Sequence, residues 1–133
     1  MSKTIITTGQ EIKVTLMDSI SYIDESDSGA FVVSGSHGGV SSARYALGVT
    51  LAGVVFNDAG IGKDNAGIAG LALLEEVGVP AMAVAHTSAR IGDAVDTWEC
   101  GVISAVNAIA AACGVKVGMT VSAAVICVRQ ADG

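Results

Sequence analysis

The chain has 133 residues, a net charge of −6 and only 15% charged side chains. A chain of this length usually forms one domain, and 51% apolar residues suffice for a core without disulfides or a metal. The acidic balance excludes nucleic acid as a partner, because no basic stripe exists to neutralise phosphates. No stretch of about twenty apolar residues predicts a membrane span.

The N-terminus and the cysteines predict a cytoplasmic protein. The opening "MSKTIITTGQE" contains no apolar signal core. Cys100, Cys113 and Cys127 are odd in number and widely spaced, which favours neither a disulfide framework nor a zinc site. With two Phe, two Tyr and one Trp, the core must consist of small aliphatic side chains. So much small apolar surface with so little charge predicts a homo-oligomer.

The first segment, residues 1–29, predicts a strand or a hairpin. It has a Thr-Gly turn between short β-rich runs, and Ile12, Val14 and Leu16 alternate with polar residues. The polar run "DESDSG" then separates this segment from the rest of the chain.

From residue 30 onward, short apolar strands alternate with helices. "AFVVSG", "AGVVFND" and "VPAMAVAHTS" are three buried strands, and the helical stretches "SSARYALGV" and "AGIAGLALLEEVG" separate them. The spacing of Val95, Val102, Val106, Ile109 and Cys113 predicts one long helix over residues 95–113. "TVSAAVICVRQ" is a final helix.

These elements predict a single α/β domain over residues 1–133. Residues 30–133 would form a βαβαβαα core, and residues 1–29 would append a strand or hairpin to it. The expected sheet is mostly parallel, with about four to five strands and helices on both faces, in a three-layer arrangement of the flavodoxin or Rossmann type.

The three strand ends carry most of the side chains capable of chemistry. Parallel strands end at the same edge of a sheet, and ligands bind there. The endings are "GSHGG" (35–39), "NDAGIGKDN" (57–65) and "AHTSARIGD" (85–93). They contain both histidines and, as further candidates, Ser36, Gly38, Gly39, Asn57, Asp58, Lys63, Asn65, Ser88, Arg90 and Asp93.

A purely structural interpretation exists for several of these residues. Ser41, Asn65 and Asp93 are good helix N-caps, and the glycines are typical turn residues. That interpretation accounts poorly for two histidines, His37 and His86, at the ends of neighbouring strands.

Known motifs fail at the residues that carry their chemistry. "GIGKDNAG" has Asp64 where a phosphate loop needs a hydroxyl, and "GSHGG" has His37 where a hydrolase elbow needs its serine. No G-x-G-x-x-G follows a strand, so no dinucleotide is expected. The sequence contains no metal-ligand spacing, although His37, His86 and an Asp could meet in space as a metal site.

The hypothesis that remains is a cofactor-free acid–base enzyme, a lyase, isomerase or hydrolase, acting on a small anionic or carbonyl-bearing metabolite. His37 and His86 would be general acid and base, and Asp58 or Asp93 would orient one of them. The anion would be held by Lys63 and Arg90, and by the polar and backbone groups of Ser36, Gly38, Gly39, Asn57, Asn65 and Ser88.

Two alternatives remain open at this point. The chain could be a non-catalytic oligomeric module that binds a small ligand, or a subunit of a larger enzyme whose remaining residues come from another chain. If His37 and His86 face one pocket, catalysis is favoured; if either packs away under a helix, binding is favoured.

Overall fold

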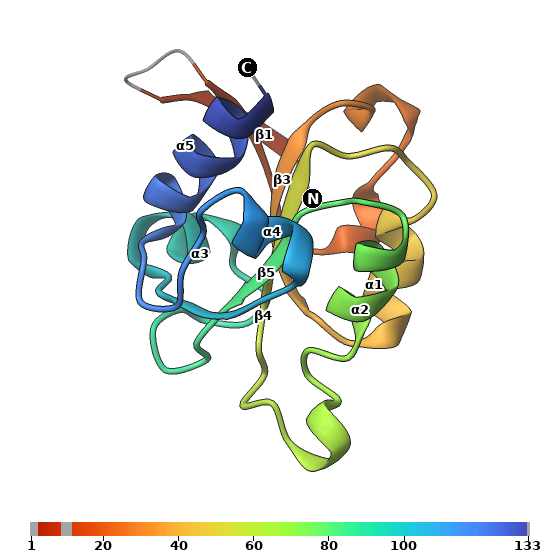
Figure 1. Ribbon diagram of the computed structural model, residues 1–133, viewed down its shortest axis with the longest axis vertical. Helices are drawn as coiled ribbons and strands as arrows, with labels where there is room; N and C mark the ends of the chain where they lie inside the picture. Colours follow the sequence, from red (N-terminus) through yellow and green to blue (C-terminus); the bar gives the residue numbers. More distant parts are fainter. Residues whose placement is uncertain (1–2, 9–11, 133) are drawn as a thin grey trace.

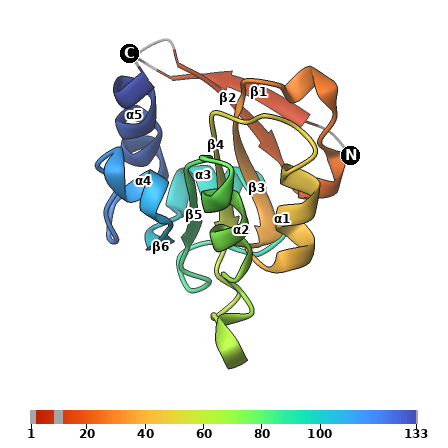
Figure 2. The ribbon, with the colours of Figure 1, turned by 45° about the vertical axis from the view of Figure 1, so that its right-hand side comes forward.

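The computed structural model describes residues 3–8 and 12–132, which form a six-stranded mixed sheet with helices on both faces (Figures 1 and 2). The strands lie side by side in chain order: β1 (Lys3–Thr7), β2 (Lys13–Met17), β3 (Phe31–His37), β4 (Gly53–Asn57), β5 (Ala81–Val84) and β6 (Ile103–Val106). β2 to β5 are parallel, whereas β1 and β6 run antiparallel at the two edges.

The N-terminal hairpin is confirmed. β1 pairs with β2 from Lys3↔Met17 to Thr7↔Lys13, and the Thr8 N–H donates to the Ile12 carbonyl at 2.9 Å. The predicted Thr-Gly turn falls partly on residues 9–11, which lie outside the described residues. Two short 3-10 turns, η1 (Ile20–Tyr22) and η2 (Glu25–Asp27), then lead from β2 to β3.

Two apolar clusters cover the two faces of the sheet. On one face, α1 (Val40–Ala46) and α2 (Gly70–Glu76) pack Ala43 and Leu74 against Val54 and Phe56. On the other, α3 (Ala94–Cys100), α4 (Ala108–Ala112) and α5 (Val121–Asp132) contribute Ala94, Ala110 and Val125 to a cluster with Val33 and Val55. Alternating side chains of each central strand point to opposite faces, which explains the continuous apolar runs of these strands.

The predicted long helix over residues 95–113 is wrong. The chain forms α3, turns at Gly101, adds β6 as a sixth strand, and only then forms α4. Gly101 cannot carry a side chain here, because a Cβ would stand 2.4 Å from the Thr97 carbonyl oxygen and 2.7 Å from Val84. The predicted βαβαβαα core is therefore βαβαβαβαα, because α3, β6 and α4 replace the predicted long helix, and the expected four to five strands become six.

The strand order also differs from the flavodoxin order. That fold places its strands in the order 2-1-3-4-5 and binds ligands where the order reverses. Here the parallel strands follow one another in chain order, so the sheet has no reversal point. Any ligand site at the carboxyl edge must therefore be built by the loops that follow the strands. None of the helices in the described part of the chain has the length and apolar character needed to cross a membrane.

Asn107 joins three elements at the amino end of β5. Its Nδ2 donates to the carbonyls of Leu71 and Val79 at 3.2 and 2.9 Å, and its Oδ1 accepts from the N–H groups of Ala81 and Ala110. The side chain is buried, so no water can replace these partners without opening the core.

Replacing Asn107 with alanine is expected to lower the free energy of unfolding by about 2–4 kcal/mol, because several buried backbone groups lose their partner. Urea unfolding followed by circular dichroism measures this difference. Asn65→Ala, at an exposed position, is the control and should change stability far less. A loss below about 1 kcal/mol for Asn107→Ala would contradict the assigned role.

Candidate functional site

The ends of β3, β4 and β5 meet at the carboxyl edge of the sheet, as the sequence predicts. His37 is the register partner of Asn57, and Asn57 is the partner of Val84, so the three chain segments leave the sheet side by side. The segment after β4 projects farthest from the body, at the bottom of Figures 1 and 2, and carries η3 (Lys63–Asn65).

The glycines of "GSHGG" allow close approach between backbone segments. A Cβ on Gly35 would stand 2.5 Å from the Asp93 nitrogen, and one on Gly38 would stand 2.9 Å from the Gly67 carbonyl oxygen. Gly70 packs in the same way, because its Cβ would stand 2.4 Å from the Gly39 carbonyl oxygen. The glycines therefore pack the three loops against one another.

Three predicted anion contacts form hydrogen bonds within the chain. The Gly38 N–H donates to the Asn57 carbonyl at 3.0 Å, and the Gly39 N–H donates to His37 Nδ1 at 3.0 Å. Ser36 Oγ accepts the Ile20 N–H at 3.0 Å. These groups shape the loop, and a bound anion would have to share donors that already have partners.

Asp58 forms the polar centre of the site. Its Oδ1 accepts the N–H groups of Gly60 and His86 at 2.8 and 3.0 Å, and its Oδ2 accepts the Ser104 hydroxyl at 2.7 Å. The ring nitrogen Nδ1 of His86 lies 3.3 Å from the same Oδ1. Burial acts to raise the pKa of Asp58, but the donors from Ser104, Gly60 and His86 outweigh it and hold the pKa below its usual value.

The lowered pKa of Asp58 makes its contribution to stability pH-dependent. Because the folded pKa lies below the unfolded value of about 3.8, this contribution is present above that pH and is lost as the pH falls through the folded pKa. We expect the difference in unfolding free energy between wild type and Asp58→Asn to be constant from pH 7 to about pH 5 and to shrink at lower pH. Urea titrations at a series of pH values measure it. A difference that stays constant down to pH 2.5 would show that the charge is not what stabilises the fold.

The Nδ1 atom of His86 faces Asp58. The ionised carboxylate can only accept, so the neutral imidazole would place its hydrogen on Nδ1 and leave a lone pair on Nε2. The ring is 56% exposed, and a Cβ built on Gly60 would stand 3.7–3.8 Å from its atoms. Asp58 therefore positions His86 through both its backbone and its ring, as in the carboxylate–histidine pairs of acid–base enzymes.

His37 adopts the opposite tautomer. A backbone N–H can only donate, so the bond from Gly39 requires a lone pair on His37 Nδ1 and leaves the hydrogen of the neutral ring on Nε2. The buried Ser42 hydroxyl lies 3.4 Å from both ring nitrogens. The two histidines thus differ in chemistry: Nε2 of His37 is a donor, whereas Nε2 of His86 is an acceptor.

The two histidines line neighbouring hollows. His37 lines a hollow of about 370 Å³, here called the apolar hollow, together with Ala59, Ile61, Gly62, Ala66, Gly67 and Ile91. His86 lines a second hollow of about 240 Å³, the polar hollow, with Thr87, Ser88, Ala89, Arg90 and Asp96. Catalysis that uses both rings therefore requires a ligand that reaches from one hollow into the other.

Three other sequence candidates have structural contacts. Asp93 caps α3, because its side chain accepts the Asp96 N–H at 2.9 Å. Asn57 is fully buried and donates to the Ala89 carbonyl, and Ser88 Oγ bridges the Ala85 carbonyl and the Val102 N–H. Ser41 lies exposed within α1, whose N-cap is Gly39.

Lys63 and Asn65 lie on the projecting segment and line neither hollow. They are exposed members of η3, and neither is among the described residues that line the two hollows. Four non-glycine residues of this segment, Ala59, Ile61, Asp64 and Asn65, have φ between 51° and 65°. For Ile61 this is a strained conformation, because its branched side chain disfavours positive φ. Such strain clusters at ligand clamps, and Ile61 lines the apolar hollow.

Ser104 and Asp96 are site residues that sequence reasoning missed. Ser104 lies on β6, inside the segment predicted as one long helix. Asp96 lies on the first turn of α3, where its Oδ2 accepts the backbone N–H of Arg90 at 2.8 Å. Asp96 also raises the pKa of the Cys100 thiol through a hydrogen bond, which makes that thiol a poor nucleophile. The signals for β6 were Gly101 and Asn107, a turn residue and a helix cap inside the predicted helix.

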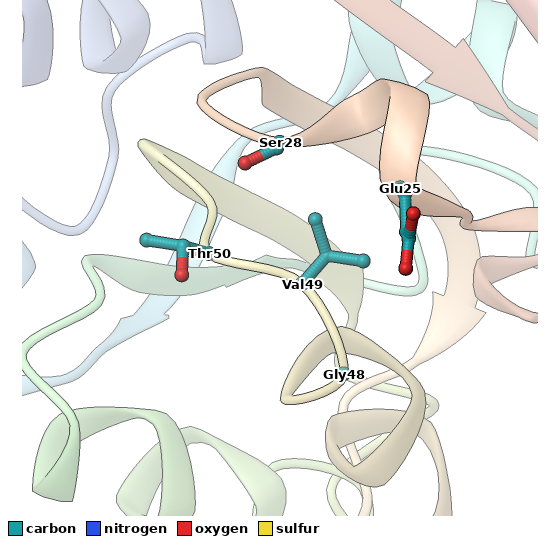
Figure 3. Close-up of a pocket in the computed structure, with 5 residues that line it drawn as sticks. All are labelled: Glu25, Ser28, Gly48, Val49 and Thr50. Carbon is teal, nitrogen blue, oxygen red and sulfur yellow. The ribbon is translucent and has the colours of Figure 1, made fainter.

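A further hollow lies at the amino ends of the strands, opposite the carboxyl edge, between η2 and the turn before β4. It measures about 400 Å³ and is lined by Glu25, Ser28, Gly48, Val49 and Thr50, with Glu25 and Ser28 facing the 48–50 turn in Figure 3. Glu25 is the one titratable side chain among these described lining residues.

Within residues 3–8 and 12–132, no three His, Cys, Asp or Glu side chains gather as a metal site would require. Comparisons with protein families, with curated proteins and with solved structures find no match for this chain. The site must therefore be interpreted from its own chemistry.

Proposed function

We propose that the protein is a cofactor-free acid–base enzyme acting on a small metabolite that bears a carboxylate and a carbonyl. The observation that carries this proposal is the contact of each Nδ1 atom: Gly39 N–H donates to that of His37, whereas the Asp58 carboxylate faces that of His86. In the neutral rings these contacts favour a donor at His37 Nε2 and an acceptor at His86 Nε2. A lyase, an isomerase or a hydrolase can use such a pair.

The proposed step moves one proton. His86 Nε2 takes a proton from the carbon next to the substrate carbonyl. The C–H electron pair becomes the new C=C bond, and the π pair of the carbonyl moves to its oxygen as an enolate forms. His37 Nε2–H donates a hydrogen bond to that oxygen. Asp58 stabilises the imidazolium that forms on His86. Arg90, on the wall of the polar hollow, binds the carboxylate.

The spacing of the two histidines suits a substrate of several carbons. The His37 backbone is in register with Asn57, and Asn57 with Val84, so two strand spacings of about 4.8 Å separate the first and last of these strands. His37 lines the apolar hollow at this edge, and His86 lines the polar hollow. The substrate would lie across this gap, with its reacting carbon facing His86.

Hydrogen exchange tests the proposal without knowledge of the natural substrate. Small oxo acids are incubated with the protein in D₂O, and loss of the proton next to the carbonyl is followed by NMR. We expect exchange with wild type and a rate lower by about 10²- to 10⁴-fold in His86→Asn. His37→Asn should slow the same step, and Arg44→Ala, at an exposed arginine on α1, is the control. Exchange that persists in His86→Asn would contradict the role of this base.

A non-catalytic binding module is the second candidate. The observation that favours it is that His37 and His86 line different hollows. In that case ligands would bind and raise the melting temperature, but no oxo acid would exchange its protons. A site completed by another chain would give the same result with the isolated protein, and exchange would appear only when that chain is added.

We further propose that the protein forms a homo-oligomer. Tyr45, Leu47 and Val77 expose 53%, 39% and 61% of their surface, and the last two line one hollow at the ends of α1 and α2. Light scattering should give a mass of at least twice 13.2 kDa. The double variant Leu47→Glu, Val77→Glu should reduce it if this face is the interface, and a monomeric wild type would refute the proposal.

A cytoplasmic location completes the proposal. Cys100, Cys113 and Cys127 all lie in the described part of the chain and are thiols, with Cys100 exposed to solvent. Exposed thiols persist in reducing compartments.

A further inference from the structure

We infer that the ligand bound at the carboxyl edge of the sheet is a small monocarboxylate that carries an apolar group. The apolar hollow would receive that group, and the polar hollow would hold the carboxylate. The carboxylate part of this inference rests on the proposed function, and the inference adds the substrate class to that function.

The apolar hollow has a single polar side chain among the residues that line it. Its walls are Ala59, Ile61, Ala66, Ile91 and glycine backbone, and His37 contributes the Nε2–H donor. Ile91 exposes 55% of its surface at the rim, although it belongs to an otherwise polar loop. An apolar hollow with one donor fits a hydrocarbon group next to an oxygen acceptor.

The two hollows are separated by consecutive residues of two loops. Arg90 lines the polar hollow while Ile91 lines the apolar one. In the same way, Ala59 lines the apolar hollow while Gly60 packs beside the His86 ring. Because consecutive residues line the two hollows, the hollows adjoin along these loops, and a single ligand is proposed to bridge them, with its apolar end in one hollow and its anionic end in the other.

The charges of the polar hollow match a single carboxylate. Arg90 supplies the positive charge, and Asp96 supplies a negative charge. The Oδ2 atom of Asp96 accepts a hydrogen bond from the backbone N–H of Arg90. A dianion would meet Asp96 without a second cation from the described residues of this hollow. A monocarboxylate can pair with the guanidinium alone.

The walls of the apolar hollow are held in place by the chain around Gly67. Gly67 is fixed against the end of β4, because a Cβ there would stand 2.0 Å from the Asp58 carbonyl oxygen, and the Gly67 N–H donates to the Ile61 carbonyl at 2.8 Å. The segment from Ile61 to Gly67 is thus closed on itself and tied to the sheet at its base. The space of about 370 Å³ has room for a branched group of three to four carbons, as in isovalerate, and for larger apolar groups.

Calorimetric titration with acetate, isobutyrate, isovalerate and 3-methylbutanol tests this inference. Isovalerate should bind wild type about 50-fold more tightly than acetate, since each buried methylene contributes about fourfold. Ile91→Ala should reduce that ratio to below about 10-fold while acetate binding is kept. Val95→Ala, at a 49% exposed valine outside both hollows, is its control.

Arg90→Ala should weaken every carboxylate by about 10- to 100-fold, with Arg44→Ala as the matched arginine control. Equal affinities for acetate and isovalerate would overturn the inference and leave the anion site of the proposed function intact. Binding of 3-methylbutanol as tight as that of isovalerate would overturn the carboxylate half. Selective isovalerate binding without hydrogen exchange on any oxo acid would support the inference and count against the enzyme.

Discussion

Replacing Gly35 with alanine should destabilise the fold by about 3–5 kcal/mol or prevent folding. Gly35 lies in the middle of the sheet, and its Cβ would stand 2.5–2.7 Å from backbone atoms of Asp93, Gly92 and Asp18. None of these atoms is the end of a flexible side chain. The Gly92 N–H also donates to the Gly35 carbonyl at 2.6 Å, so the loop cannot move away without losing that bond.

Gly78→Ala is the matched control for this prediction. Gly78 follows the end of α2 with a φ of +77° and has nothing within 4 Å of an added Cβ, so the expected loss is about 1 kcal/mol from backbone strain alone. Urea unfolding of the two variants separates the clash from the strain. Similar losses in both would mean that the 90–93 loop does not pack on β3 as described.

Replacing Asp58 with alanine should lower the free energy of unfolding by about 3–5 kcal/mol at pH 7. The side chain accepts three hydrogen bonds from Gly60, His86 and Ser104, and it is buried beside the end of β4. Truncation leaves these donors without their acceptor and opens a cavity between β4, β6 and the loop after β5.

Asp58→Asn keeps the shape of the side chain and should lose roughly half as much, because its Oδ1 can still accept the two N–H groups. Ser104→Ala, which removes one donor, should cost about 1 kcal/mol. Unfolding curves at pH 7 rank the three variants. An Asp58→Ala loss no greater than that of Ser104→Ala would show that the carboxylate does not hold the site together.

Local sequence patterns were sufficient to predict the parallel strands at the centre of the sheet. The apolar runs before Ser34, Asn57 and Ala85 lie on β3, β4 and β5, because a strand covered on both faces must be apolar along its whole length. The alternation of Val14 and Leu16 with polar residues located β2 for a similar reason. Since parallel strands share an edge, the positions of His37, Asp58 and His86 followed from the chain alone.

Only the tertiary structure decided which groups contact one another at that edge. β6 was missed because "VISAVNAIAAACG" has helical spacing, and its strand conformation depends on pairing with β5, a partner distant in sequence. With β6 came Ser104, the donor that helps keep Asp58 ionised. The glycines and histidines were visible in the sequence, but their partners were not. A glycine in the sequence indicates only that another part of the chain can pack closely against it. An imidazole acquires its donor or acceptor role from the group that the fold places beside it.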